Sequence, residues 1–125
     1  MCIRDRGLAD WQSGTGPALL AQYQGLVLQM DTARLDARIS QRFDAMLDMG
    51  ALDEARAALP HWPDSPLQPP PWTRAIGAPE LIAHLRGQIS LPEATAAAKL
   101  ASRQYAKRQR TWFRNRMKNW AQIAL

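Results

Sequence analysis

Cations dominate the carboxy-terminal third of this 125-residue sequence. Eight of its sixteen Lys and Arg residues lie between Lys99 and Lys118, whereas all eleven acidic residues lie at or before Glu93. Residues 1–93 therefore carry a net charge of −3 from eight basic and eleven acidic side chains, and residues 94–125 carry +8. The run from Ser102 to Asn115 sets these cations among aromatic and amide side chains and contains no acid. Such segregation is typical of a surface that binds nucleic acid or a membrane surface.

Six of these cations share one side of a predicted helix. Ser90 and Glu93 form a capping box at its start, in which each side chain accepts from the other residue's amide. We expect the helix to reach about Trp120, roughly 45 Å away at about 1.5 Å per residue. At about 100° per residue, an arc of roughly 100° holds a cationic stripe made of Lys99, Arg103, Lys107, Arg110, Arg114 and Lys118.

The cationic stripe allows two interpretations. It could be an ordinary solvated helix face, because Lys and Arg are good helix formers. It could instead follow a phosphate backbone and gain affinity from counterion release. A solvated face normally intersperses Glu, so the absence of acids favours phosphate binding.

The opposite side of this helix is apolar and aromatic, with Ala94, Ala98, Ala101, Tyr105, Trp112 and Phe113. The rings could stack on bases, but their place on the apolar side favours packing in a core. Gln104 and Gln109 are more plausible than the aromatic rings as side chains that recognise bases, through their polar amide groups. Arg108 and Arg116 lie on or near the apolar side, so each would need a buried partner or a bound phosphate.

A shorter line of cations is predicted on an earlier helix, where Arg34, Arg38 and Arg42 are spaced four apart. Acids that could pair with them there are Asp36, Asp44 and Asp48. From spacing alone, pairing with these acids is the favoured interpretation, and phosphate binding is the alternative.

Catalytic and metal-binding patterns are weak. His61 and His84 are isolated from each other and from any Cys or paired carboxylates, which favours a structural role for both. The Gly14-Thr15-Gly16 segment lacks the Gly-Lys-Ser/Thr ending of a phosphate loop and is expected to be a turn. The residues alone therefore predict a helical nucleic-acid-binding module without catalytic apparatus.

Helices are expected to make up most of the chain. The first long helix begins with Asp31 or Thr32 as its N-cap and ends at Gly50. Short helices are expected over residues 52–59 and 79–85, with Gly87 closing the second. The apolar face of the first helix consists of Leu35, Ile39, Phe43, Met46 and Leu47.

A short buried strand is expected at residues 26–28, Leu-Val-Leu, and nothing else reads as a strand. A strand this short needs neighbours on both edges and both faces. We therefore expect a mainly α fragment, a helical bundle with one short β-strand, that belongs to something larger.

Composition fits one modest domain, with 46% hydrophobic and 22% charged residues. Cys2 is the only cysteine, so the sequence offers no disulfide or Cys-based zinc site and suits a reducing compartment. The start lacks a signal-peptide pattern, and no apolar run approaches the roughly 18 residues of a membrane span. We expect a cytoplasmic protein whose residues 1–6 are a truncated or non-native start.

Four motifs together resemble the carboxy-terminal part of the bacterial tRNA dimethylallyltransferases. They are residues 38–47 (RISQRFDAML), 50–54 (GALDE), 75–81 (AIGAPEL) and 102–114 (SRQYAKRQRTWFR), and they occur in the family's order. The resemblance extends from about Gly7, where residues 8–12 are similar to the family segment before the strand, to Trp120.

This resemblance implies an α/β P-loop-type transferase fold and a specific reaction. The family transfers a dimethylallyl group from dimethylallyl pyrophosphate to N6 of the adenosine next to the anticodon in tRNA. The base is flipped into a channel whose other end admits the donor. The implied partners are the tRNA anticodon arm and the donor, with Mg²⁺ as cofactor, no membrane, and a monomeric full-length enzyme.

The resemblance also assigns individual residues. Arg42 matches a family arginine implicated in donor pyrophosphate interaction. A family loop that touches tRNA aligns with Leu67, Gln68, Pro69, Pro70, Pro71 and Trp72, and Arg74 follows it. A second tRNA-contacting stretch aligns with Leu100, Ala101, Ser102, Arg103, Gln104, Tyr105, Ala106 and Lys107, and we add Arg110 from the cationic stripe. Ser102 replaces the usual family threonine and keeps the hydroxyl.

The resemblance divides the chain into a strand-helix segment of the catalytic core (7–59), a Pro-rich loop (60–72) and a helical tRNA-contacting segment (73–125). It implies that the phosphate loop, the general-base aspartate, the metal ligands and the inserted helical region lie outside these residues. The fragment alone is therefore expected to be inactive. The alternative is a non-catalytic helical RNA-binding module. A membrane-surface amphipathic helix ranks lower, because Tyr105 and Trp112 share their face with Gln109 and Arg116.

Overall fold

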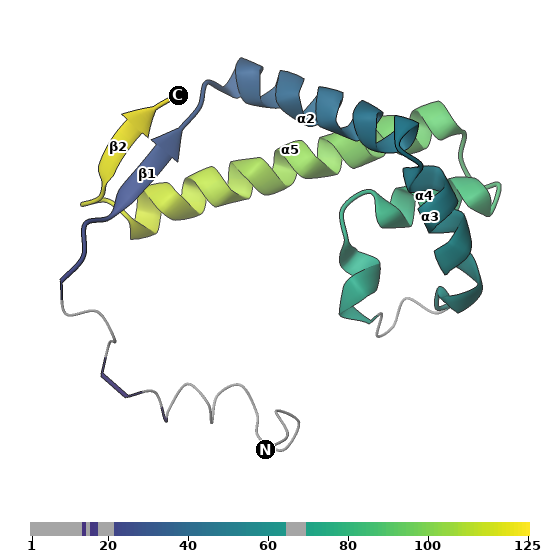
Figure 1. Ribbon diagram of the computed structural model, residues 1–125, viewed down its shortest axis with the longest axis horizontal. Coiled ribbons are helices and arrows are strands. Elements are labelled where there is room, and N and C mark those ends of the chain that lie inside the picture. The colour runs from purple at the N-terminus through teal and green to yellow at the C-terminus, as the bar shows by residue number, and fades with distance from the viewer. Residues whose placement is uncertain (1–13, 15, 18–21, 65–69) are drawn as a thin grey trace.

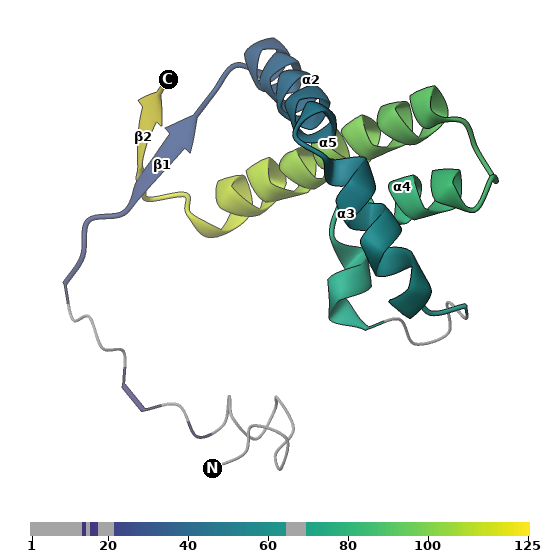
Figure 2. The ribbon, with the colours of Figure 1, turned by 45° about the vertical axis from the view of Figure 1, so that its right-hand side comes forward.

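The computed structural model describes residues 14, 16–17, 22–64 and 70–125. Two long helices lie side by side, two short helices pack at one end of them, and a pair of strands lies at the other end (Figures 1 and 2). In chain order the strands and α-helices are β1 (Leu26–Gln29), α2 (Thr32–Asp48), α3 (Ala51–Ala58), α4 (Ala78–Leu85), α5 (Leu91–Arg116) and β2 (Ala121–Ala124). The predicted mainly α architecture is confirmed.

Helix α2 begins as the sequence predicts. The Asp31 carboxylate accepts a hydrogen bond from the Arg34 amide at 3.0 Å, which satisfies one of the free N–H groups of the first turn. The helix ends at Asp48, and Gly50 turns the chain into α3 with a left-handed φ of 102°. Only a residue without a Cβ takes this conformation readily, so the α2–α3 corner depends on glycine.

One hydrophobic core joins the segments on either side of the proline-rich connector. Its buried members are Phe43, Ala55, Leu81, Ile82 and Ala98, which come from all four α-helices. Ala94 and Ala98 on α5 are fully buried, and their small side chains allow α4 to approach closely. The core therefore lies at the end of the bundle where α3 and α4 meet the long pair.

Helix α5 begins with the predicted capping box but ends earlier than predicted. The Glu93 carboxylate accepts from the Ser90 amide at 2.8 Å, and the Glu93 amide donates to Ser90 Oγ at 3.4 Å. The helix stops at Arg116 rather than near Trp120. Trp120 instead packs edge-on against Tyr23, with ring centroids 6.0 Å apart, and over Gly25. This contact directs the chain back toward β1. Helical periodicity does not predict it, because Tyr23 and Trp120 are far apart in the sequence.

The expectation of a single strand is wrong. Residues Ala121–Ala124 form β2, which pairs with β1 in parallel, with Leu26 opposite Ala121 and Gln29 opposite Ala124. The term "buried" is also wrong for most of β1, because Val27 is buried whereas Leu26 is 50% and Leu28 63% exposed. A two-stranded parallel pair covers one edge only, so both faces keep apolar side chains in contact with solvent.

The connector after α3, predicted as a Pro-rich loop over residues 60–72, contains two 3-10 turns, Leu59–His61 and Pro71–Arg74. Thr73 is buried and donates its hydroxyl to the Pro70 carbonyl at 2.7 Å. Residues 65–69 lie outside the described residues, so the predicted contacts of Leu67, Gln68 and Pro69 cannot be located. Among the described helices, none is long and apolar enough to cross a membrane.

Candidate functional site

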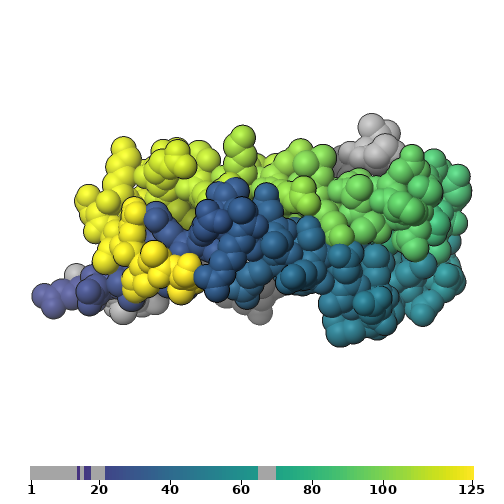
Figure 3. Space-filling view, turned by 90° about the horizontal axis from the view of Figure 1, so that it is seen from above, coloured from purple at the N-terminus to yellow at the C-terminus, as the bar shows by residue number. Residues whose placement is uncertain are grey.

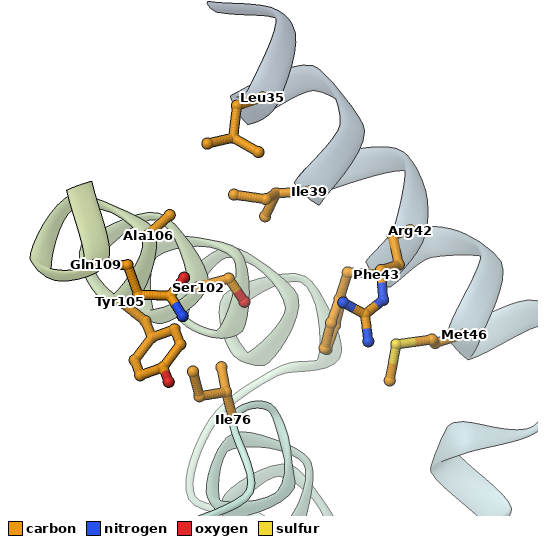
Figure 4. Close-up of a pocket in the computed structure, with 10 residues that line it drawn as sticks. All are labelled: Leu35, Ile39, Arg42, Phe43, Met46, Ile76, Ser102, Tyr105, Ala106 and Gln109. Carbon is orange, nitrogen blue, oxygen red and sulfur yellow. The ribbon is translucent and has the colours of Figure 1, made fainter. Parts of the chain in front are cut away.

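A cavity of about 450 Å³ opens between α2, α5 and the loop before α4 (Figure 4). Its lining residues are Leu35, Ile39, Arg42, Phe43, Met46, Ile76, Ser102, Tyr105, Ala106 and Gln109. The cavity brings together Arg42 and three residues of the predicted tRNA-contacting stretch, Ser102, Tyr105 and Ala106. These residues are sixty or more positions apart in the sequence, so only the packing of α2 against α5 makes them neighbours.

One cation faces an otherwise apolar and neutral lining. Arg42 is exposed and has no carboxylate within 4.0 Å among the described residues. Leu35, Ile39 and Ile76 supply aliphatic surface, and Figure 4 shows Leu35 and Ile39 side by side on α2 with Ile76 on the opposite side of the cavity. An arginine beside aliphatic walls suits a ligand with an anionic head and a small apolar tail.

The position of Arg42 depends on its buried neighbour. Phe43 is 5% exposed and anchors this turn of α2 in the core. Gly77 lies directly against the Phe43 ring, since a Cβ at Gly77 would be 2.8 Å from Phe43 Cε2. Gly77 also has a left-handed φ of 97°. The sequence analysis did not give Ile76 a place at this cavity, although Ile76 lies beside Gly77 in one of the motifs that carry the family resemblance.

The cationic stripe is partly occupied by contacts with α2. Lys99 Nζ lies 2.6 Å from Asp44 Oδ1, and Arg103 Nη2 donates to Ser40 Oγ at 3.3 Å. Arg110 donates to Thr32 Oγ1. Figure 3 shows the two helices running side by side. The stripe is therefore not one continuous solvent-exposed face, because three of its six cations form a hydrogen bond or an ion pair with α2.

The exposed side of α5 carries two cations of the stripe, Lys107 and Arg114, together with Arg108. We call it the outward face, made of Leu100, Gln104, Lys107, Arg108, Thr111 and Arg114, all exposed. Arg108, for which a buried partner or a bound phosphate was predicted, is exposed, and its guanidinium lies over the Tyr105 ring, 5.9 Å from the centroid. Arg116 is also exposed.

Inward packing of the aromatic side is only partly observed. Ala94 and Ala98 are buried as predicted, whereas Tyr105 is 48% and Trp112 52% exposed. Phe113 is half-buried and meets Trp112 edge-on, with centroids 5.5 Å apart. The difference arises because α4 covers only the first turns of α5, and no other helix of the described residues packs on that side of the later turns.

The predicted pairing of the α2 arginines with nearby acids is not observed among the described residues. The only ion pairs there are Lys99–Asp44, Arg56–Asp53 and Arg86–Asp64. Asp44 of α2 thus pairs with Lys99 of α5 and not with an arginine of its own helix. Arg34, Arg38 and Arg42 are exposed.

The histidines and acids offer no metal centre within the described part of the chain. His84 Nδ1 lies 3.1 Å from the Ile89 carbonyl oxygen, which accepts a hydrogen bond from it, and this contact within the fold suits the predicted structural role. No group of three or more His, Cys, Asp or Glu side chains gathers there to hold a metal ion. These residues therefore do not fit a magnesium site of their own.

Comparison with known proteins identifies the protein family. A model of the IPP transferase family matches residues 3–116, and the chain belongs to this family. A tRNA dimethylallyltransferase of Cereibacter sphaeroides strain ATCC 17025 is 62% identical over 122 residues, which cover 96% of this chain and 40% of that protein. One from Dinoroseobacter shibae is 58% identical over 120 residues, or 94% of this chain and 39% of that protein.

Solved structures agree with this assignment. The full-length tRNA isopentenylpyrophosphate transferase of Bacillus halodurans is similar with a TM-score of 0.70 and 35% identity, over 81% of this chain and 32% of that chain. The corresponding enzyme of Staphylococcus epidermidis gives 0.68 and 34%, over 80% and 31%. This chain thus spans about two fifths of the length of the curated relatives that it matches.

Proposed function

We propose that this chain is the carboxy-terminal part of a tRNA dimethylallyltransferase. The observation that carries this proposal is the cavity that places Arg42 beside aliphatic walls and opposite Ser102 and Tyr105 of α5. The reaction would join N6 of the adenosine next to the anticodon to the allylic carbon of dimethylallyl pyrophosphate, while the carbon–oxygen bond to pyrophosphate breaks and a general base outside this chain takes the proton that N6 loses.

Arg42 has the chemistry that this step requires. The leaving pyrophosphate gathers negative charge as its bond to carbon breaks, and a fixed cation nearby lowers the barrier. Arg42 is an exposed guanidinium with no acid beside it among the described residues, and its helix turn is anchored by buried Phe43. Leu35, Ile39 and Ile76 offer the five-carbon tail of the donor an apolar wall.

The tRNA would be bound by surfaces on either side of this cavity. We propose contacts from residues 67–72 and Arg74, and from residues 100–102 and 104–107 together with Arg110. Trp72 is 49% exposed and packs edge-on against Trp62, with centroids 5.2 Å apart, so it presents a rigid aromatic surface for a base. Gln104 and Lys107 on the outward face are free to meet the anticodon arm.

The remaining parts of the activity would come from residues outside this chain. We propose that the phosphate loop, the general base and any Mg²⁺ ligands belong to the portion that the longer relatives have in addition. The described residues have no metal cluster, so no step of the reaction is assigned to a metal here. We further propose a cytoplasmic, monomeric full-length enzyme.

A chimera tests the proposal. The 122 residues of this chain that match the Cereibacter sphaeroides enzyme would replace the corresponding segment of that enzyme. The chimera should transfer a labelled dimethylallyl group to an anticodon stem-loop with adenosine next to the anticodon. A stem-loop with guanosine at that position is the substrate control, and the isolated chain should be inactive. A folded chimera that transfers nothing would contradict the proposal, and RNA binding by the isolated chain would then favour the non-catalytic module.

A further inference from the structure

We propose that Arg103 is a positioning residue that holds the donor-side arginine of α2 in place, rather than a residue that contacts tRNA phosphate. The inference rests on the function proposed above. It assigns to the pair Arg103 and Ser40 the role of a clamp that fixes α2 against α5 at the level of the cavity.

The two long helices have few buried side chains between them at this level. Phe43 is the only buried residue of α2, and the buried residues of α5, Ala94 and Ala98, face the core near its start. Residues 32–42 of α2 contribute half-buried side chains at most. Polar contacts across the helix pair therefore have a large share in setting its geometry there.

Arg103 is built into this contact. Its Nη2 donates to Ser40 Oγ at 3.3 Å, and its Nε is shielded from solvent without a hydrogen-bond partner among the described residues. A guanidinium keeps its charge at every physiological pH, so it carries this partial desolvation into the folded state. Asp44, one turn after Ser40, supplies the nearby negative charge and is itself 2.6 Å from Lys99.

The clamp and the cavity use adjacent residues on both helices. On α5, Arg103 holds Ser40 while its neighbour Ser102 lines the cavity. On α2, Ser40 accepts this bond, and Arg42 lines the cavity two residues later. A shift of α2 at Ser40 would therefore change the separation between Arg42 and the α5 wall. Lys107, on the outward face, has no such contact with α2 among the described residues.

The test uses the active chimera and two readouts. Arg103→Gln and Ser40→Ala should each raise the KM for dimethylallyl pyrophosphate about five- to tenfold, the effect expected from losing one hydrogen bond of ordinary net strength. The double variant should be no worse than Arg103→Gln alone, because both changes remove the same contact. Arg103→Lys, which retains a donor, should recover part of the loss. None of these should change the salt dependence of tRNA binding, whereas Lys107→Gln should reduce it.

Two results would overturn the inference in an active chimera. One is an additive effect of Arg103→Gln and Ser40→Ala on the donor KM. The other is a loss of tRNA affinity and salt slope in Arg103→Gln that equals the loss in Lys107→Gln, with Ser40→Ala unchanged. If the parent chimera is folded but inactive, the proposed function fails first, and that outcome is separate from these two.

Discussion

Single arginines in this chain have different tasks although the residue type is the same. Arg42 faces a cavity, Arg103 and Arg110 reach across to α2, and Arg108 lies over a tyrosine ring. Charge alone does not separate these roles. The neighbours of each guanidinium separate them. An arginine that already has a protein partner gains less binding energy from a ligand phosphate than an arginine that only water surrounds.

Replacing Arg42 by alanine in the chimera should mainly impair use of the donor. We expect kcat/KM for dimethylallyl pyrophosphate to fall about 100-fold, because a cation near the developing negative charge is lost. Affinity for the stem-loop should stay the same. Arg38→Ala removes an equally exposed arginine one turn away that does not line the cavity, and it is the matched control. Similar losses in both variants would contradict the role of Arg42.

Lys107→Gln should weaken binding of tRNA and flatten its salt dependence by about one unit of slope per phosphate contact. The measurement is the stem-loop dissociation constant over a series of salt concentrations. Lys99→Gln is the control, since Lys99 is already paired with Asp44. An unchanged slope for Lys107→Gln would remove the outward face from the proposed interface.

At the scale of elements, caps and glycines decide where each helix lies. The α3–α4 end of the bundle is anchored by one core, and Gly77 lets the loop before α4 touch the Phe43 ring. The start of α5 depends on the capping box, which satisfies amides that the helix itself leaves free.

Gly77→Ala should destabilise the protein more than Gly50→Ala. Both glycines have a similar left-handed φ, 97° and 102°, so both variants lose about 1–2 kcal/mol for the backbone. A Cβ at Gly50 would meet nothing within 4 Å, whereas one at Gly77 would meet Phe43 Cε2 at 2.8 Å. Overpacking should add about 1–3 kcal/mol to Gly77→Ala. Urea unfolding of the two variants measures the difference, and equal losses would refute the steric argument.

The capping box of α5 should make stability depend on pH in the acidic range. Hydrogen bonds from the Ser90 side chain and then from its backbone hold the pKa of Glu93 below its usual value. A carboxyl with a lowered folded-state pKa stabilises the fold above its unfolded-state pKa and loses that effect as pH falls through the folded-state value. Unfolding free energy should therefore drop as pH falls below the usual pKa of a glutamate and through the lower folded-state pKa of Glu93. In Glu93→Gln, this part of the pH dependence should disappear.

At the scale of the whole molecule, the strand pair leaves apolar side chains in contact with solvent. Leu26 and Leu28 on β1 and Ile123 on β2 are 50%, 63% and 41% exposed. A two-stranded parallel sheet with apolar faces in solvent is unstable by itself. The longer relatives have the additional chain that could cover it, since this chain spans only 40% of the Cereibacter sphaeroides enzyme.

Amide hydrogen exchange should reveal this difference. In the isolated chain, the amides of β1 and β2 should exchange faster than those of α4 and the first half of α5, where the core lies. In the chimera, the strand amides should become protected by at least about tenfold, because neighbouring strands and helices cover them. Equal protection of the strands in both proteins would contradict the idea that β1 and β2 need the additional chain.

The sequence alone determined where most of the helices begin and end, because local interactions set these positions. Asp31 caps α2, Ser90 and Glu93 cap α5, and Gly87 ends α4, because each of these signals acts within a few residues. The sequence motifs around Arg42 and Ser102 were also sufficient to identify the family. The assignment of individual tRNA contacts stays a prediction.

Only the tertiary structure decided which cations are free. A helical wheel places Arg103 and Lys107 on one stripe, but the approach of α2 gives Ser40 to Arg103 and leaves Lys107 in solvent. The second strand was missed for the same reason, since Ala121–Ala124 gains its ladder bonds from β1, more than ninety residues earlier. Periodicity describes one element at a time, whereas a cavity, a sheet partner or an occupied side chain depends on how distant elements pack.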